Sequence, residues 1–148
     1  MQLTNTELTV PATATALGRA GLLPFCLAPL LIYVDPERRG FYAEALASYA
    51  LAILCFLVGI WWGLALIRRT PGALLLSNAV VIVAFFGHIL LAPPAFYLLC
   101  CALFPLTVVV ERILPLFRPQ PAYYASLRLQ LTVVATLALL AAAALLAV

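Results

Sequence analysis

The chain of 148 residues contains no lysine, a single histidine and five acidic residues, so charged side chains make up only 9% of it. Apolar side chains make up 67%. A soluble globular domain carries about 25% charged residues, so this chain has too little polar surface to cover such a globule. The net charge of +3 comes from eight arginines near the ends of apolar runs. The composition therefore predicts a protein solvated by lipid and excludes a nucleic-acid-binding one.

Metal and redox motifs are also missing. The four cysteines, Cys26, Cys55, Cys100 and Cys101, lie within apolar runs, and no two have the C-x-x-C spacing of such sites. Neighbouring Cys100 and Cys101 would point about 100° apart on a helix, which prevents an ordinary disulfide. We expect four small buried thiols, no metal site and no cofactor.

The N-terminal segment lacks the features of a targeting sequence. Residues 1–16 contain Glu7 but no basic residue, whereas a secretory signal begins with positive charge and a transit peptide is rich in arginine. We expect these residues to form a mobile tail before a first span that is retained.

Five apolar stretches are long enough to cross a bilayer core, which takes about 20 helical residues. They cover residues 17–34, 41–67, 73–91, 95–114 and 128–148. The sequence therefore predicts an all-α, polytopic transmembrane bundle with one domain over residues 17–148. Pro24 and Pro29 should kink the first span, because each removes a backbone donor. A re-entrant hairpin in place of spans three and four is the alternative, although each arm is long enough to cross.

The arginines predict an orientation. One side of the predicted bundle collects six of them, Arg19, Arg68, Arg69, Arg112, Arg118 and Arg128, and the other side has only Arg38 and Arg39. The positive-inside rule then places the N-terminus in the cytoplasm and, after five crossings, the C-terminus outside. An odd number of spans and the lack of an inverted repeat disfavour a transporter.

Small and polar residues recur every three or four positions along the second span, at Glu44, Ser48, Ala52, Cys55, Gly59 and Gly63. This spacing puts them on one helix face, where Gly59-x-x-x-Gly63 predicts close packing against another helix; a ligand groove is the alternative. Glu44 and His88 should reach the same outer layer and could pair. The alternative is that each faces the interface separately.

A second group of polar and aromatic residues should lie at one depth near the inner surface: Arg19, Trp61, Trp62, Ser77, Asn78, Glu111, Arg112 and Arg128. Glu111 needs a cation, which Arg128 or Arg19 could supply. The simple interpretation is that arginines extend to lipid phosphates and one ion pair fixes the bundle. The alternative is a headgroup or anion site.

Three segments carry a family resemblance: residues 21–25 (GLLPF), residues 49–65 (YALAILCFLVGIWWGLA) and residues 121–132 (PAYYASLRLQLT). They resemble the small membrane proteins grouped as domain of unknown function 3429, related to transmembrane protein 69. The resemblance implies a multi-pass protein of bacterial inner membranes, or of mitochondrial inner membranes in eukaryotes, with no established activity. The family often has histidine at the position of Trp61 and aspartate at that of Glu111, so a proton-handling histidine is not carried over.

Three classes of function fit these observations. The absence of loops, nucleophiles and metal ligands favours a non-catalytic protein that packs against or assists other membrane components. A small transporter or channel would need polar residues across the middle of the bilayer, where only Cys55, Thr107 and Thr136 occur. The third class is a lipid-binding or lipid-modifying protein that uses the inner Arg and Glu residues. Membrane lipids are the expected partners, and other membrane proteins or a second copy stay open.

Overall fold

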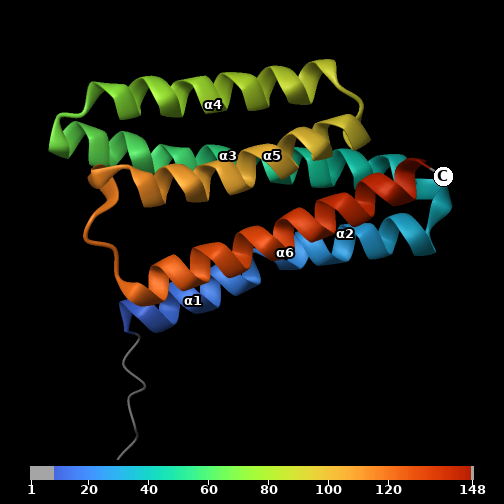
Figure 1. Ribbon diagram of the computed structural model, residues 1–148. Helices are drawn as coiled ribbons and strands as arrows, with labels where there is room; N and C mark the ends of the chain where they lie inside the picture. The colour runs from blue at the N-terminus through green and yellow to red at the C-terminus, as the bar shows by residue number, and fades with distance from the viewer. Residues whose placement is uncertain (1–8, 148) are drawn as a thin grey trace, which may run out of the picture.

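The computed structural model describes residues 9–147, and this part of the chain is built of helices joined by short connections (Figure 1). In chain order the elements are α1 (Val10–Ala20), α2 (Leu23–Val34), the short 3₁₀ turn η1 (Pro36–Arg38), α3 (Arg39–Arg68), α4 (Pro71–Leu90), α5 (Pro93–Ile113), the 3₁₀ turn η2 (Pro115–Phe117) and α6 (Ala122–Ala147). Five helical segments are long and apolar enough to span a membrane, with α1 and α2 together forming the first. The prediction of an all-α, multi-pass membrane protein is confirmed.

Two predicted boundaries are wrong. Residues 10–16, which we expected in the tail, form most of α1, while residues 1–8 of that tail lie outside the described residues. Helix α6 begins at Ala122, six residues before the predicted start of the fifth span at Arg128. The charge of Arg128 had suggested a span end, but its side chain is neutralised inside the bundle, so the helix continues through it.

The first span is interrupted between α1 and α2 at Gly21 and Leu22. Helix α1 ends at Ala20, four residues before Pro24, where the proline ring would collide with a helical carbonyl. The Tyr49 hydroxyl donates a hydrogen bond to the Gly21 carbonyl at 2.8 Å, which satisfies a group that the break leaves free. Pro29, by contrast, lies inside α2. The predicted kink at Pro24 is thus a break.

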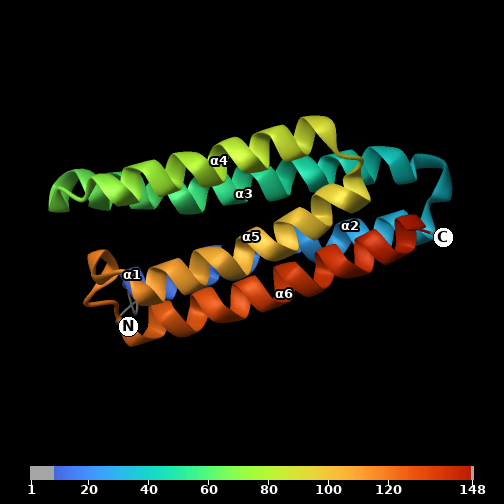
Figure 2. The ribbon, with the colours of Figure 1, turned by 45° about the horizontal axis from the view of Figure 1, so that its top comes forward.

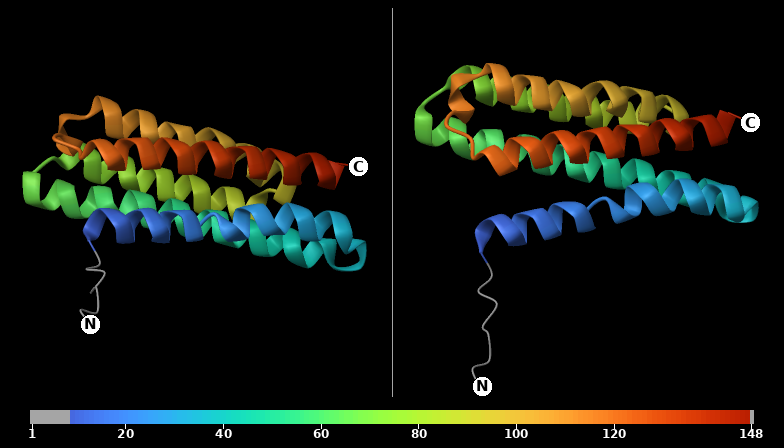
Figure 3. Two further views of the ribbon diagram at one scale, coloured as in Figure 1. Left: turned by 90° about the horizontal axis from the view of Figure 1, so that it is seen from below. Right: turned by 60° about the horizontal axis from the view of Figure 1, so that its bottom comes forward.

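Helices α3 and α5 hold the bundle together (Figures 1 and 2). Helix α3 packs against α2, α4 and α5, helix α5 packs against α3, α4 and α6, and α1 packs mainly against α6. The broken rod of α1 and α2 runs along the bundle beside α6 (Figure 3). The α3–α4 turn, the α5–α6 loop and the start of α1 lie at one end of the molecule, which we call the Arg-rich end because Arg68, Arg69 and Arg118 lie there. Its cytoplasmic orientation stays a prediction.

The buried interior divides into two apolar clusters. The larger includes Phe25, Leu54 and Phe104, and the smaller, towards the Arg-rich end, includes Trp61 and Phe117. The prediction of four buried thiols is wrong, because only Cys100 is buried, while Cys26 is exposed and the other two are partly exposed. An apolar run in a membrane helix includes lipid-facing positions as well as interior ones, which is why the run alone did not place the thiols.

Candidate functional site

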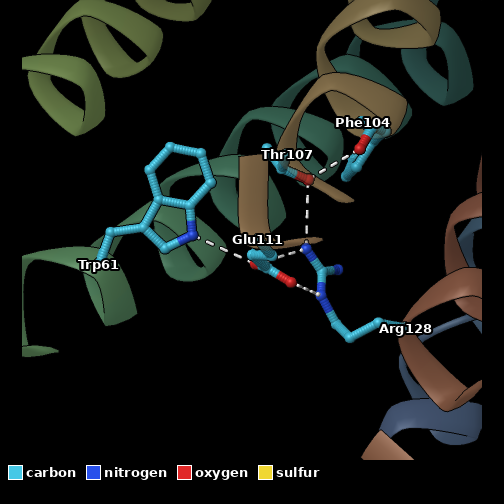
Figure 4. Close-up of polar contacts among 5 residues, drawn as sticks. All are labelled: Trp61, Phe104, Thr107, Glu111 and Arg128. Atoms are coloured by element: carbon cyan, nitrogen blue, oxygen red, sulfur yellow. Dashed lines mark hydrogen bonds and ion pairs between the residues drawn. The ribbon is translucent and has the colours of Figure 1, made fainter. Parts of the chain in front are cut away.

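A buried ion pair joins α5 and α6 near the Arg-rich end (Figure 4). Arg128 Nη2 lies 3.0 Å from Glu111 Oε1, and Arg128 Nε donates to Glu111 Oε2 at 3.1 Å. The side chains are only 6% and 7% exposed, respectively. Of the two cations that we had considered for Glu111, the structure selects Arg128, whereas Arg19 is exposed.

Two further side chains complete the polar cluster, which we define as Trp61, Thr107, Glu111 and Arg128. Trp61 Nε1 donates to Glu111 Oε1 at 3.1 Å from α3, and Arg128 Nη2 donates to Thr107 Oγ1 at 3.1 Å. Thr107 and Glu111 are four residues apart on α5, so they share a face. The Thr107 hydroxyl in turn donates to the Phe104 carbonyl at 2.7 Å. A buried ion pair is stable only when such hydrogen bonds complete it, and here α3, α5 and α6 all contribute.

Two polar groups of α6 remain available beside the cluster. Arg128 uses Nε and Nη2 for its hydrogen bonds, and Nη1 forms none with the residues that the structure describes. One helical turn further on, Thr132 is 5% exposed and its Oγ1 likewise has no partner within residues 9–147. Burial of an unbonded hydroxyl is unfavourable, so that of Thr132 calls for an explanation, as do those of Thr70 and Thr136, which also lack a partner within residues 9–147.

Both residues line a cavity that we call the apolar groove. Its volume is about 380 Å³, and it lies among α1, α2, α3, α5 and α6. Leu17 of α1 and Phe56 and Ile60 of α3 line it and are themselves exposed, by 68%, 68% and 39%. The groove therefore opens sideways between α1 and α3, towards the lipid. Its other lining residues are almost all apolar, and Tyr124, Arg128 and Thr132 supply its polar groups from α6.

A second cavity, the loop hollow, lies under the α5–α6 loop at the Arg-rich end and has a volume of about 350 Å³. Glu111 contributes to its wall, together with Phe117 of η2 and Tyr123 of α6. The Phe117 ring packs edge-on against Trp61, with centroids 5.8 Å apart, so η2 closes over the polar cluster. Ile60 and Tyr124 line both cavities, which therefore adjoin at these two side chains.

Five residues predicted for the inner group stay outside the polar cluster. Arg19 is exposed, and the buried Ser77 donates from Oγ to the Leu74 carbonyl of its own helix. Trp62 is 43% exposed, Asn78 is exposed and donates from Nδ2 to the Leu74 carbonyl of its own helix, and Arg112 is exposed. Trp61, which we had placed with Trp62 near the inner surface, is fully buried and bonds Glu111. Adjacent residues point about 100° apart on a helix, so only one of the two tryptophans could face inward.

Glu44 and His88, which we had considered as a possible pair, do not pair. No hydrogen bond or ion pair joins them among the described residues, where the Glu111 pair is the single ion pair. Glu44 is exposed on α3, and the His88 ring packs edge-on against Phe96 with centroids 5.2 Å apart. The two side chains lie at one end of the bundle but in different surroundings, which matches the alternative that we had left open.

Within the described part of this chain no helix packs closely against Gly59 and Gly63, so close packing there stays a prediction that needs a helix of another molecule. A Cβ added at either glycine would meet no atom of the structure within 4 Å, and the stripe that contains them, with Ser48, is exposed. Close helix approach occurs instead at Gly87 of α4, where a Cβ would collide with Leu99 of α5, and at Gly18 of α1, where it would come within 3.0 Å of Leu131. The spacing alone does not say which glycine faces a helix.

The sequence analysis did not assign Thr107, Thr132 or Tyr124 to a site. A usable signal was present, because Tyr124, Arg128 and Thr132 recur every four residues and therefore form one polar line along α6. Within residues 9–147, no three His, Cys, Asp or Glu side chains come together as metal ligands would.

Comparison with known proteins agrees with this architecture. The chain is 39% identical over 74 residues to transmembrane protein 69 of Xenopus tropicalis, an alignment that covers 48% of this chain and 29% of the relative. The chain thus aligns with less than a third of that relative's length. No solved structure gives a significant match. The model of a family described as a protein of unknown function (DUF3429) matches residues 10–144. The chain therefore belongs to the DUF3429 family.

Proposed function

We propose that this protein is a non-catalytic accessory protein of its membrane that binds a single lipid. The observation that carries the proposal is the apolar groove, which opens sideways towards lipid and is lined by the buried Arg128, whose Nη1 forms no hydrogen bond with residues 9–147. The lipid tail would lie in the groove, and an oxygen of its headgroup would accept a hydrogen bond from Arg128.

The dimensions of the groove suit one lipid tail. Its α6 wall extends from Tyr124 to Ala135, which at 1.5 Å per residue is roughly 17 Å. One leaflet of the hydrocarbon core is about half of 30 Å thick, so the groove has the depth of one leaflet. Its volume of about 380 Å³ also falls within the range of ligand cavities in proteins, about 300–1,000 Å³.

The polar end of the groove suits an acidic headgroup. A guanidinium group binds phosphate oxygens with short, charge-assisted hydrogen bonds, and Arg128 keeps one nitrogen free for this. The unpartnered hydroxyl of Thr132 lies one turn deeper in the wall and can bond an ester oxygen of the same lipid. A bound lipid thereby supplies a partner for Arg128 Nη1 and for the Thr132 hydroxyl, neither of which forms a hydrogen bond with residues 9–147.

The other two classes of function have less support. Three N–H donors, from Trp61 and Arg128, take most of the acceptor sites of the Glu111 carboxylate, which leaves room for one further donor but makes the group a poor general base. For transport, the polar line of α6 would have to continue to the far end of the bundle, but beyond Thr136 that helix consists of apolar residues up to Ala147.

The membrane and the orientation are part of the proposal. We place the protein in the bacterial inner membrane, as the resemblance to DUF3429 proteins implies, with the Arg-rich end in the cytoplasm. An alkaline phosphatase fusion at the C-terminus should then be active, because the enzyme folds only on the outer side, whereas a green fluorescent protein fusion there should be dark. The reverse pattern would overturn the orientation.

Native mass spectrometry of the protein released from lipid nanodiscs tests the lipid-binding proposal. We expect a complex with one lipid to persist in the wild type and to disappear in Ala14→Phe, because Ala14 lines the groove and phenylalanine would fill it. Ala12→Phe is the matched control, since Ala12 lies on the same helix, is exposed and does not line the groove. Equal lipid retention in both variants, or no bound lipid in the wild type, would refute the proposal.

A further inference from the structure

One cavity is lined by Arg128 and the other by Glu111, so a ligand that fills both should carry an anionic group and a cationic group in that order. Resting on the proposed function, we infer that the bound lipid carries a phosphate and a primary ammonium group, with the phosphate at Arg128 in the apolar groove and the ammonium at Glu111 in the loop hollow. Phosphatidylethanolamine is the simplest lipid of this class.

The two members of the ion pair line different cavities. Arg128 lines the groove and not the hollow, whereas Glu111 lines the hollow and not the groove. Ile60 and Tyr124 line both, so the two spaces adjoin at these side chains. A molecule that passes from one cavity to the other therefore meets a cation first and an anion second.

A phosphoethanolamine headgroup has the complementary order. Its phosphate and its ammonium are joined by two carbons, so it can lie antiparallel beside a guanidinium and a carboxylate that are 3.0 Å apart. The depth order also agrees, because α6 leads from Ala135 through Arg128 to Tyr123 near its start, and a lipid leads from tail through phosphate to amine. The tail would thus contact the apolar side chains of the groove, the phosphate would contact Arg128, and the ammonium would contact Glu111.

The walls of the loop hollow suit an ammonium group. Tyr123, Tyr124 and Phe117 provide aromatic surface, which attracts cations, and the side chain of Gln120 offers a carbonyl acceptor. Glu111 is the carboxylate among the hollow's lining residues. Arg68 also lines the hollow, but it is exposed, so water and salt screen its charge, and it donates from Nη1 to the Arg118 carbonyl at 2.8 Å.

Other headgroups leave part of this arrangement unused. A phosphatidylglycerol would satisfy Arg128 but bring no cation to Glu111. A phosphatidylcholine brings a cation without an N–H group, which can contact the aromatic rings but cannot donate a hydrogen bond to the carboxylate. Phosphatidylserine has the required phosphate and ammonium and adds a carboxylate, so it tests whether the shared chemistry or the ethanolamine group alone is recognised.

The experiment uses nanodiscs that contain equal amounts of phosphatidylethanolamine, phosphatidylserine, phosphatidylglycerol and phosphatidylcholine with identical acyl chains. Native mass spectrometry then reports which lipid stays bound to the full-length protein. We expect the two ammonium-bearing phospholipids with N–H groups to exceed the other two by roughly fivefold, the effect of about 1 kcal/mol from one partly exposed ionic contact.

Substitutions at Gln120 test where the selection occurs. Gln120→Lys places a cation in the hollow and should abolish the preference, whereas Gln120→Glu at the same position should maintain or increase it. Glu111→Gln should shift the preference to phosphatidylglycerol, because the guanidinium of Arg128 is then uncompensated. The Gln120 variants decide the matter even if Glu111→Gln does not fold, since Gln120 lies in a loop outside the polar cluster.

The outcomes separate this inference from the proposed function. A wild type that retains one lipid without headgroup preference, or prefers phosphatidylglycerol or phosphatidylcholine, overturns the inference and leaves lipid binding intact. A preference for the ammonium lipids that Gln120→Lys leaves unchanged also overturns it, because the selection is then made outside the loop hollow. A wild type that retains no lipid refutes both.

Discussion

The polar cluster and the exposed face of α3 contain the same kinds of residue in opposite surroundings. Glu111, Trp61 and Thr107 are buried and bonded to one another or to Arg128. Glu44, Trp62 and Ser48 are exposed on α3, beside the open positions of the two glycines. The two regions do not differ in residue type. They differ in whether a partner on another helix lies within reach.

The comparison shows what holds this bundle together. Lipid tails are as apolar as a leucine side chain, so burial of apolar surface between helices gives little of the stabilisation that it gives in water. Hydrogen bonds, the ion pair and close backbone approach contribute more of the difference between interior and exterior. We therefore expect substitutions in the polar cluster to be costly and the matched substitutions on α3 to be neutral.

The largest expected effect comes from Arg128→Met, which leaves Glu111 buried without a cation. Loss of one partner of a buried ion pair typically destabilises by about 3–5 kcal/mol. We expect thermal unfolding in detergent to occur at a clearly lower temperature. The control Glu44→Gln should unfold like the wild type, because Glu44 is exposed. A double variant with Glu111→Met should recover part of the loss; if Arg128→Met alone proves neutral, the pair does not stabilise the bundle.

Trp61→Phe should have the next largest effect. It removes the Nε1 donor to Glu111 and leaves a void beside Phe117, and a hydrogen bond to a charged group alone is worth about 1.5–3 kcal/mol. Trp62→Phe is the matched control on the same helix, with the side chain 43% exposed. Equal melting temperatures for the two variants would contradict the assignment of Trp61 to the cluster.

Gly87→Leu should destabilise the α4–α5 contact by about 1–3 kcal/mol, because its side chain would overlap Leu99. Gly59→Leu, at a position with open space around it, should leave the unfolding of the monomer unchanged. Thermal unfolding and folded yield in detergent measure both. A loss of stability in Gly59→Leu would show that α3 has a partner outside this chain. The exposed face of α3 would then be an interface too, and it would no longer differ from the polar cluster in lacking a partner.

The smallest effect is expected for Thr107→Val, which removes one acceptor from Arg128 while keeping the shape of the side chain. The loss of such a hydrogen bond costs about 1 kcal/mol. Ser48→Ala on the exposed face of α3 should have no measurable effect. A neutral Thr107→Val variant would mean that another acceptor, such as a lipid oxygen in the groove, replaces the hydroxyl.

Much of the architecture could be predicted from residue type and spacing. Apolar runs gave the spans to within a few residues at most boundaries, and the scarcity of acids made Glu111 the residue that needed a cation. The inward face of each helix could not be predicted. In a soluble helix the polar side faces water and so marks the outside, but along most of α3 both sides are apolar or small. The spacing of Gly59 and Gly63 suggested an interface, whereas close approach occurs at Gly87.

The sequence by itself determined that the chain lives in a membrane and crosses it about five times, because backbone groups in lipid must be satisfied within helices and the length of an apolar run sets the crossing. Only the tertiary structure decided that Arg128, and not Arg19, neutralises Glu111, and that Trp61 turns inward while Trp62 faces out. The two cavities beside the ion pair were likewise decided only by the tertiary structure. Each is enclosed by helices far apart in the sequence, and their rotation about their own axes is set by packing against one another.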